Sequence, residues 1–310
     1  MKTQRGVALL TALILLALTA MLAVKIGFDS ALTARRSTAT LGMEQALALT
    51  QGSEALAAYA LAEDEDKKQD TLTESWAQPY GPVEVVPEVG IEAQLFDEQG
   101  KFNLNTLLKP DGKPDEDAML IFKRMLELLE IEPYWASQLV DWLDPDVYSL
   151  PEGGEDSLYA SQLPPYRTAN LLVSSVSELE QLPGFGRERY LKLLPHVTAL
   201  PPTASTINVC TASPVVLDAL FALSQNNSNN VEFTRMLPEE FAKSREAGCF
   251  PPLSTLTDGE IKVAQRTAET SSFFRLRTGI RIGSARFALY SLMYRNADNV
   301  RPIARTFGTD

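Results

Sequence analysis

The most hydrophobic stretch of the chain lies close to its N-terminus. Residues 7–24 carry no charge, and only Thr11 and Thr19 among them are polar. A helix over these residues is about 27 Å long at ~1.5 Å per residue, which matches the hydrocarbon thickness of a bilayer. Lys2 and Arg5 precede the run, and positive charge marks the cytoplasmic side of a membrane segment. The sequence therefore predicts a single-pass helix with a cytoplasmic N-terminus and an exported remainder.

The apolar pattern continues beyond the membrane segment at helical spacing. Residues 27–61 contain no proline, and apolar side chains recur at positions such as Leu41 and Ala48. We predict one long helix over residues 7–61, whose outer half packs against the rest of the same chain. The acidic run at residues 63–66 ends this pattern and is predicted to be a solvated loop.

Alternation of apolar and polar positions appears in two distant parts of the chain. In residues 83–108 it is broken by a turn-like segment at 97–100, which predicts a β-hairpin with its turn there. Two further strand-like runs, 273–282 and 285–295, are separated by a Gly-Ser pair. We predict one antiparallel sheet assembled from both parts. Arginines at alternate positions indicate a solvated face of this sheet: Arg275, Arg277, Arg281 and Arg286.

The residues between these two parts change to a helical pattern. Amphipathic helices are predicted at 114–130, 133–142, 175–182 and 187–194. Farther along, the pattern predicts a short strand at 207–209, a helix at 214–223 and an Asn/Ser-rich loop at 225–230. The sequence therefore predicts an α+β fold. Residues 62–108 and 205–310 form an α/β head, and residues 109–204 form an inserted all-helical domain.

Composition narrows the possible function classes. The net charge is −12, and residues 109–204 hold 16 acidic and 8 basic side chains, which disfavours a protein that binds nucleic-acid backbone. The chain has one histidine, His196, and two cysteines, so multi-His and Cys₄ zinc sites are excluded. His196 has no accompanying Ser or Cys nucleophile motif and is predicted to be structural. No nucleophile–base pair can be named, which disfavours an enzyme.

The N-terminus allows three interpretations. A cleaved secretory signal has a shorter apolar region followed by a small-residue cleavage site, and a plain signal anchor is not cleaved. In the third, cleavage falls before the apolar run, between Gly6 and Val7. The pattern K-x-x-R-G followed by V-A-L-L resembles the class III signal of type IV pilins and type II secretion pseudopilins. This resemblance implies that a prepilin peptidase cuts after Gly6 and methylates the new terminal amine of Val7.

Thr11 occupies the fifth position of the chain that such cleavage would leave. Pseudopilins usually have Glu there, to neutralise the terminal amine of a neighbouring subunit, and the pseudopilin K family characteristically lacks it. A carboxylate inside a bilayer is expensive without a cationic partner, so a subunit with no neighbour to neutralise has no use for one. The phrase FNLNTLL at residues 102–108 is also typical of the pseudopilin K family.

The resemblance covers the whole chain and implies its fold, its partners and its place. The fold is a long helix packed on an antiparallel sheet, with the extra helical domain peculiar to the K subunits. The implied role is a minor pseudopilin of type II secretion that caps the tip of the pseudopilus, helps to initiate it and limits its length. The implied partners are minor pseudopilins of the I and J types, the major pseudopilin, and the prepilin peptidase. The implied location is the bacterial inner membrane, with a periplasmic head.

Five carboxylates gather in one short, glycine-containing segment: Asp141, Asp144, Asp146, Glu155 and Asp156. They repel one another unless a cation gathers them, and hard oxygen ligands on a flexible loop suit Ca²⁺. The spacing is not that of an EF-hand. A merely solvated loop is the alternative, but Trp142 and Tyr148 within the segment favour burial, which is a poor environment for unpaired carboxylates. The segment also resembles the K-subunit insert, in which calcium binding fits the family, and we predict a structural Ca²⁺ here.

The sequence L-P-G-F-G at residues 182–186 is typical of a helix-hairpin-helix, whose amides bind DNA phosphate. The phosphate contacts would be Arg187, Arg189 and Lys192. The alternative function is therefore a signal-anchored periplasmic DNA-binding protein of the uptake type. In the other interpretation, Gly184 and Gly186 only build a tight turn between two helices. The net negative charge of residues 109–204 favours this turn and disfavours nucleic-acid binding.

The two cysteines, Cys210 and Cys249, lie in the exported part of the chain, where disulfides form. A bond between them would close a 39-residue loop, worth about 4 kcal/mol in the chain-entropy account. Two buried free thiols are the alternative.

Overall fold

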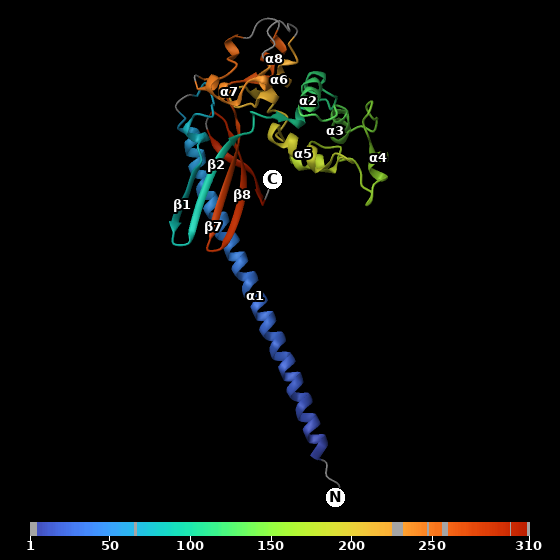
Figure 1. Cartoon of the computed structure of the whole chain (residues 1–310), viewed down its shortest axis with the longest axis vertical. Helices are drawn as coiled ribbons and strands as arrows, with labels where there is room; N and C mark the ends of the chain where they lie inside the picture. Colours follow the sequence, from blue (N-terminus) through green and yellow to red (C-terminus); the bar gives the residue numbers. More distant parts are fainter. Residues whose placement is uncertain are drawn as a thin grey trace.

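The computed structural model describes residues 5–64, 67–224, 232–246, 248–255, 260–297 and 299–308. The predicted loop at 225–230 and two residues of the acidic run at 63–66 lie outside the described residues. The molecule has a long N-terminal helix, a five-stranded sheet, and a group of short helices. Figure 1 shows these short helices at the end of the molecule farthest from the N-terminus and to one side of the sheet.

The N-terminal helix α1 is continuous over Arg5–Ala62. Every residue from Val7 to Leu41 is exposed, and in Figure 1 this half of α1 stands free of the rest of the chain. The helix is long and apolar enough to cross a membrane, by length and composition. The hydroxyls of Thr11 and Thr19 each donate to a backbone carbonyl three residues earlier, at 3.0 Å. Both polar groups are thus satisfied within the helix, as a bilayer requires.

The sheet is antiparallel throughout, with the strand order β1-β2-β7-β8-β9. The strands are β1 (Tyr80–Val86), β2 (Val89–Asp97), β7 (Phe273–Ile282), β8 (Ala285–Arg295) and β9 (Val300–Phe307). The predicted runs 273–282 and 285–295 coincide with β7 and β8. The sequence did not predict β9, since it is an edge strand whose residues are mostly exposed and carry no apolar alternation.

The predicted hairpin turn at residues 97–100 is wrong. The hairpin joins β1 and β2, and its turn contains Glu88, which has a left-handed backbone with φ 68°. After Asp97 the chain leaves the sheet for β3 (Phe102–Asn103), which pairs in parallel with β4 (Val197–Thr198). The reason is that the polar residues after β2 are buried and bonded to distant segments. The side chain of Gln99, for example, accepts from the backbone N–H of Ser272 at 2.6 Å.

Most of the remaining elements are short helices, several of them one-turn 3₁₀ helices. Before the predicted insert lie η1 (Ser75–Ala77) and η2 (Leu104–Leu107). The others, in chain order, are α2 (Glu116–Leu128), α3 (Trp135–Leu143), α4 (Asp156–Ala160), η3 (Val176–Gln181), α5 (Gly186–Leu193), η4 (Leu194–His196), α6 (Pro214–Phe221), η6 (Phe233–Arg235), α7 (Pro238–Arg245), η7 (Leu253–Thr255) and α8 (Ile261–Gln265). The short strands β5 (Ile207–Asn208) and β6 (Thr267–Ala268) pair in parallel.

The main hydrophobic core does not stop at the predicted boundary after residue 204. One continuous cluster of buried residues runs from Phe102 to Val263. Helix α6 is strongly apolar on its inner side and packs against α2, so it belongs with the earlier helices. The inserted unit is therefore larger than predicted, and we call residues 102–268 the helical body.

Helix α1 packs on the sheet through small and aliphatic side chains. Ala57 and Leu61 meet Phe274 and Leu276 of β7, and Ala46 meets Ile280. An ion pair adds to these contacts, because Glu54 accepts from Arg305 of β9 at 2.7 and 2.8 Å. The predicted packing of the outer half of the helix against its own head is therefore what the structure shows.

Candidate metal centre

The acidic segment forms the link between α3 and α4. Asp144 ends α3, Asp146 lies in the following loop, and Glu155 precedes α4. One carboxylate oxygen from each lies within 4.8 Å of one from each of the other two. Asp144 and Glu155 are buried, whereas Asp146 is exposed. The structure thus brings three of the five predicted ligands together at the surface of the helical body.

Asp141 has a different role from these three carboxylates. It is fully buried, and its oxygens accept from the backbone N–H of Leu150 at 3.1 Å and of Gly154 at 2.7 Å. A Cβ at Gly153 would lie 2.0 Å from one of these oxygens, so only glycine fits there. Asp141 therefore holds the loop in the shape that gathers the other carboxylates.

Asp156 also lies outside the group of three. Its Oδ1 accepts from the backbone N–H and the hydroxyl of Thr168, at 3.2 and 3.0 Å. Arg167 lies 3.8 Å from its other oxygen. These contacts tie the start of α4 to the segment near residue 168.

Burial and mutual repulsion raise the pKa values of two carboxyls in the group. Burial, followed by the charges of Asp146 and Asp141, raises the pKa of Asp144 to about 6. Burial and the neighbouring carboxylates, Asp141 foremost, raise the pKa of Glu155 to about 7. Without a cation, this group of carboxyls therefore tends to hold protons.

Several buried polar atoms around the group have no hydrogen-bond partner among the described residues. They include Asp144 Oδ1 and Glu155 Oε1, and also the amide oxygens of Gln138 and Asn170. Gln138 and Asn170 contact the same loop, since their amide nitrogens donate to the carbonyls of Glu152 and Asp146. Orphaned buried oxygens are unusual in native proteins. A set of hard oxygens of this kind fits Ca²⁺.

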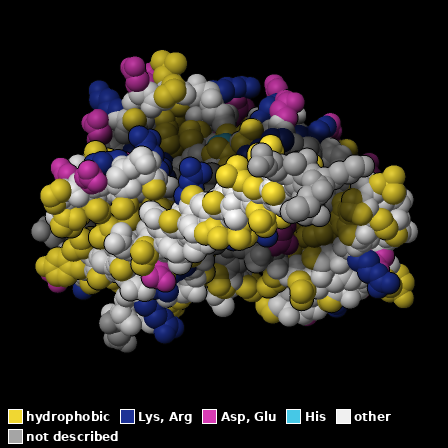
Figure 2. Space-filling view, turned by 90° about the horizontal axis from the view of Figure 1, so that it is seen from below, with side chains coloured by type: hydrophobic (Ala, Val, Ile, Leu, Met, Phe, Trp, Pro, Cys, Tyr) yellow, Lys and Arg dark blue, Asp and Glu magenta, His cyan; other side chains and the backbone are white. Residues whose placement is uncertain are grey.

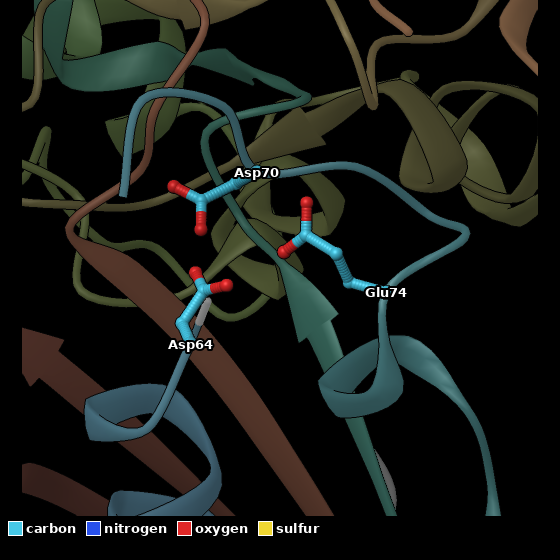
Figure 3. Close-up of side chains that lie close together, drawn as sticks. All are labelled: Asp64, Asp70 and Glu74. Carbon is cyan, nitrogen blue, oxygen red and sulfur yellow. The ribbon is translucent and has the colours of Figure 1, made fainter. Parts of the chain in front are cut away.

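A second carboxylate group, formed by Asp64, Asp70 and Glu74, was not predicted from the sequence. Figure 3 shows these side chains converging from the end of α1 and the segment that follows it. Arg295 of β8 forms ion pairs with Asp64, at 3.3 Å, and with Asp70. The Asp64 side chain is 4% exposed, so the prediction of a solvated loop is wrong at this residue. A guanidinium supplies the counter-charge here, and the group fastens the end of α1 to β8.

The predicted helix-hairpin-helix residues form a turn between η3 and α5. Gly184 and Gly186 have φ of 86° and 76°, which glycine adopts without strain. The three basic residues are each paired with an acid of this chain: Arg187 with Glu180 at 3.1 Å, Arg189 with Glu132 at 2.9 Å, and Lys192 with Glu188 at 3.7 Å. Hydrogen bonds from Arg189 lower the pKa of Glu132 to about 2. The structure thus favours the turn over phosphate binding.

The cysteines and the histidine all lie in the helical body. Cys210 and Cys249 form a disulfide with a Cα–Cα distance of 4.2 Å. Close to it, the half-buried Arg245 donates to the carbonyls of Val209 and Ala212. The Nδ1 of His196 lies 2.8 Å from the hydroxyl oxygen of Ser213, which also caps the start of α6.

Comparisons with known proteins agree on one family. The family model described as "Type II secretion system (T2SS), protein K" matches residues 100–202, which include the first part of the helical body. Type II secretion system protein K of Klebsiella pneumoniae is 33% identical, over 98% of this chain and 97% of its own. The Pseudomonas aeruginosa protein of the same name is 31% identical, over 98% of this chain and 93% of its own. The chain belongs to the type II secretion system protein K family.

A solved structure supports the fold independently. The GspK chain of the GspK–GspI–GspJ complex from enterotoxigenic Escherichia coli superposes with a TM-score of 0.71 at 24% identity, covering 89% of this chain and all of that chain. The predicted α+β class, a long helix on an antiparallel sheet with an inserted helical part, is confirmed.

The family places the chain in type II secretion, as a minor pseudopilin and a structural component of that system. The apolar N-terminal helix fits an inner-membrane anchor. These relatives give no support to the alternative of a DNA-uptake protein.

Proposed function

We propose that this minor pseudopilin caps the tip of the pseudopilus, where it initiates the filament and limits its length. The position of the helical body carries this proposal. It lies beyond and beside the end of the sheet farthest from the membrane helix (Figure 1). A filament stacks subunits along the direction of their helices, so a body in that place would obstruct the next subunit. At the tip there is free space above it.

The proposed partners are minor pseudopilins of the I and J types, together with the major pseudopilin. The related E. coli subunit was solved in complex with GspI and GspJ. Thr11 supports an end position as well, because a hydroxyl cannot neutralise the terminal amine of a neighbour within a bilayer. In this proposal the N-terminus is cytoplasmic and the head is periplasmic.

The proposed role is assembly without catalysis. The Nδ1 of His196 lies 2.8 Å from the hydroxyl oxygen of Ser213, a contact of the kind that joins a base to a nucleophile. The Ser213 oxygen already accepts from the N–H of Val216 at 3.4 Å as the cap of α6, so capping accounts for this serine. We expect deletion of the gene to shorten or abolish pseudopili and to stop secretion, and the full-length chain to restore both. Unchanged filament number, filament length and secretion in the deletion strain would contradict the proposal.

We propose that a prepilin peptidase processes the chain between Gly6 and Val7. Substitution Gly6→Leu should leave the leader attached and block assembly, since the peptidase must fit a small residue at the cut. Gly27→Ala is the matched control, because a Cβ at Gly27 meets nothing within 4 Å in this chain. Mass spectrometry of the N-terminal peptide reads the result. A methylated Val7 terminus in the Gly6→Leu protein would contradict the proposal.

We propose that Asp144, Asp146 and Glu155 bind a structural Ca²⁺, with Asp141 shaping the loop. The orphaned oxygens and the raised pKa values of Asp144 and Glu155 support this proposal. Calorimetric titration of Ca²⁺ into the metal-free full-length chain should show binding that Glu155→Gln weakens at least tenfold. Glu152→Gln makes the same change at an exposed position of the same loop and should bind normally. Equal Ca²⁺ affinity of both variants, or no Ca²⁺ binding by the wild type, would contradict the proposed calcium site.

A further inference from the structure

The face of the sheet that points away from α1 carries four arginines. Arg275, Arg277 and Arg281 lie on alternate positions of β7, and Arg286 lies on β8. Two of them have internal partners: Arg275 lies 3.2 Å from Glu98, and Arg277 lies 3.6 Å from Glu92. This basic face stands out in a chain whose net charge is −12.

Arg281 and Arg286 are directly opposite each other in the register of β7 and β8. Like charges at opposed positions of an antiparallel pair destabilise the sheet. Both side chains are exposed, and within the described ranges neither forms an ion pair or a hydrogen bond. The sequence thus keeps a repulsive pair for which the described part of the chain supplies no ion-pair or hydrogen-bond partner. A ligand with negative charge would compensate it.

The surface beside this pair is hollowed. A cavity of ≈ 580 Å³ is lined by Arg277, Arg281 and Arg286 and also by two carboxylates, Glu84 and Glu92, of which Glu92 is paired with Arg277. Its floor includes two glycines, and the Glu92 side chain lies over one of them, Gly279. Gly90 lies directly opposite Arg281 on β2, and Gly279 lies opposite Ala288 on β8. The guanidinium of Arg281 extends over Gly90, 3.3–3.7 Å from where a Cβ would be. We call these three arginines and their cavity the basic hollow.

The position of the basic hollow argues for a protein ligand instead of a lipid headgroup. Next to Arg286, Phe287 contacts α1 at Gly42. Gly42 lies 18 residues beyond the last residue of the apolar run, which is about 27 Å of helix at ~1.5 Å per residue. The headgroup layer adds only about 5–8 Å outside the hydrocarbon. Figure 2 views the molecule from the N-terminal end of α1 and shows both basic and acidic side chains among the hydrophobic ones.

We propose that the basic hollow binds a pair of carboxylates on the surface of a neighbouring minor pseudopilin. The proposal rests on the assembly role described above. Each guanidinium presents a planar fork of donors that matches a carboxylate, and Arg is favoured for such contacts between proteins. Two carboxylates would neutralise Arg281 and Arg286 together. The contact then relieves the cross-strand repulsion as the subunits join, which favours the assembled state over the free chain.

The test uses the full-length chain in detergent with the I and J minor pseudopilins of its own secretion system. Arg281→Glu combined with Arg286→Glu should weaken the complex at least tenfold, and the wild-type complex should weaken as salt rises. The matched control is Lys109→Glu with Lys243→Glu, the same change in charge at two exposed residues elsewhere. Its affinity should equal that of the wild type.

A single substitution separates docking from a structural role. Arg286→Glu places a negative charge directly opposite the positive charge of Arg281. The melting temperature of the free chain should therefore stay the same or rise, while binding to the partner weakens. If melting temperature and binding both fall, the arginines are structural and the inference is overturned.

Unchanged binding by the double variant, with a wild type that does bind, overturns the inference alone. A wild type that binds neither partner overturns the assembly role as well. Binding of the wild type to phosphatidylglycerol vesicles or duplex DNA that the double variant loses would assign the hollow to lipid or nucleic acid instead.

Discussion

Asp144 and Glu155 are held in an environment that opposes their ionisation. Burial and neighbouring carboxylates raise their pKa values to about 6 and about 7, against ordinary values of 3.8 and 4.5. The sequence predicted this cluster because five carboxylates lie close together in the chain. It could not separate Asp141 and Asp156 from the other three, since their different roles depend on the backbone amides of residues 150 and 154 and on Thr168.

The metal-free chain should lose stability as pH rises. The folded chain holds protons on Asp144 and Glu155 more tightly than the unfolded chain does. The contribution of these two groups to the free energy of unfolding is therefore greatest below pH 4. It is lost as pH rises through about 6 to 7. Between pH 5 and pH 8 in EDTA, the melting temperature should fall at least about 3 °C further for the wild type than for Glu155→Gln.

Two observations check this pH dependence. Glu155→Gln is the reference because the variant retains every other titrating group. Saturating Ca²⁺ should abolish the larger fall in melting temperature that the wild type shows between pH 5 and pH 8, since the ion binds the ionised carboxylates. Parallel melting curves for the wild type and the variant in EDTA would mean that Glu155 has an ordinary pKa.

Gly153 should be irreplaceable in the acidic loop. An added Cβ would lie 2.0 Å from Asp141 Oδ2, so Gly153→Ala should lower the free energy of unfolding by about 1–3 kcal/mol. Gly52→Ala is the matched control, because a Cβ there meets nothing within 4 Å and α1 is helical. Alanine should stabilise that helix position by about 0.5–1 kcal/mol. Chemical denaturation measures both, and equal effects of the two substitutions would contradict the packing argument.

At the scale of elements, the sequence pattern predicted the helices and strands whose residues follow a long, regular apolar periodicity. Helix α1 and strands β7 and β8 have long, regular patterns, and the structure places them where the sequence did. The turn at 97–100 was misplaced because its polar residues are buried by contacts with segments more than a hundred residues away, such as the bond between Gln99 and Ser272. The carboxylate group at Asp64 was missed for the same reason, since its cation, Arg295, lies on β8.

The disulfide should contribute strongly to the stability of the helical body. The bond between Cys210 and Cys249 closes a loop across a sequence separation of 39. Replacement of both cysteines by serine should lower the free energy of unfolding by about 4 kcal/mol in the chain-entropy account. Limited proteolysis should then cut first between residues 210 and 249, while the α1–sheet unit stays intact. Equal melting temperatures of the wild type and the double variant would contradict this contribution.

At the scale of the whole molecule, the chain is a pseudopilin sheet and helix that carry a second body of comparable size. The sequence predicted an insert but ended it at residue 204. A change of pattern marks where helices begin, but it does not show that α6, which follows β5, packs back on α2. The proposed tip position depends on this larger body, which lies beyond the sheet (Figure 1) and which we propose prevents stacking along a shaft.

The location of the chain on the filament tests this account most directly. Pseudopili isolated from cells should be labelled with gold-coupled antibodies raised against the helical body and counted by electron microscopy. The account predicts label at one end of each filament, in about one copy, with antibodies to the major pseudopilin labelling the shaft. Label against the helical body distributed along the shaft, at the density of the major pseudopilin, would contradict it.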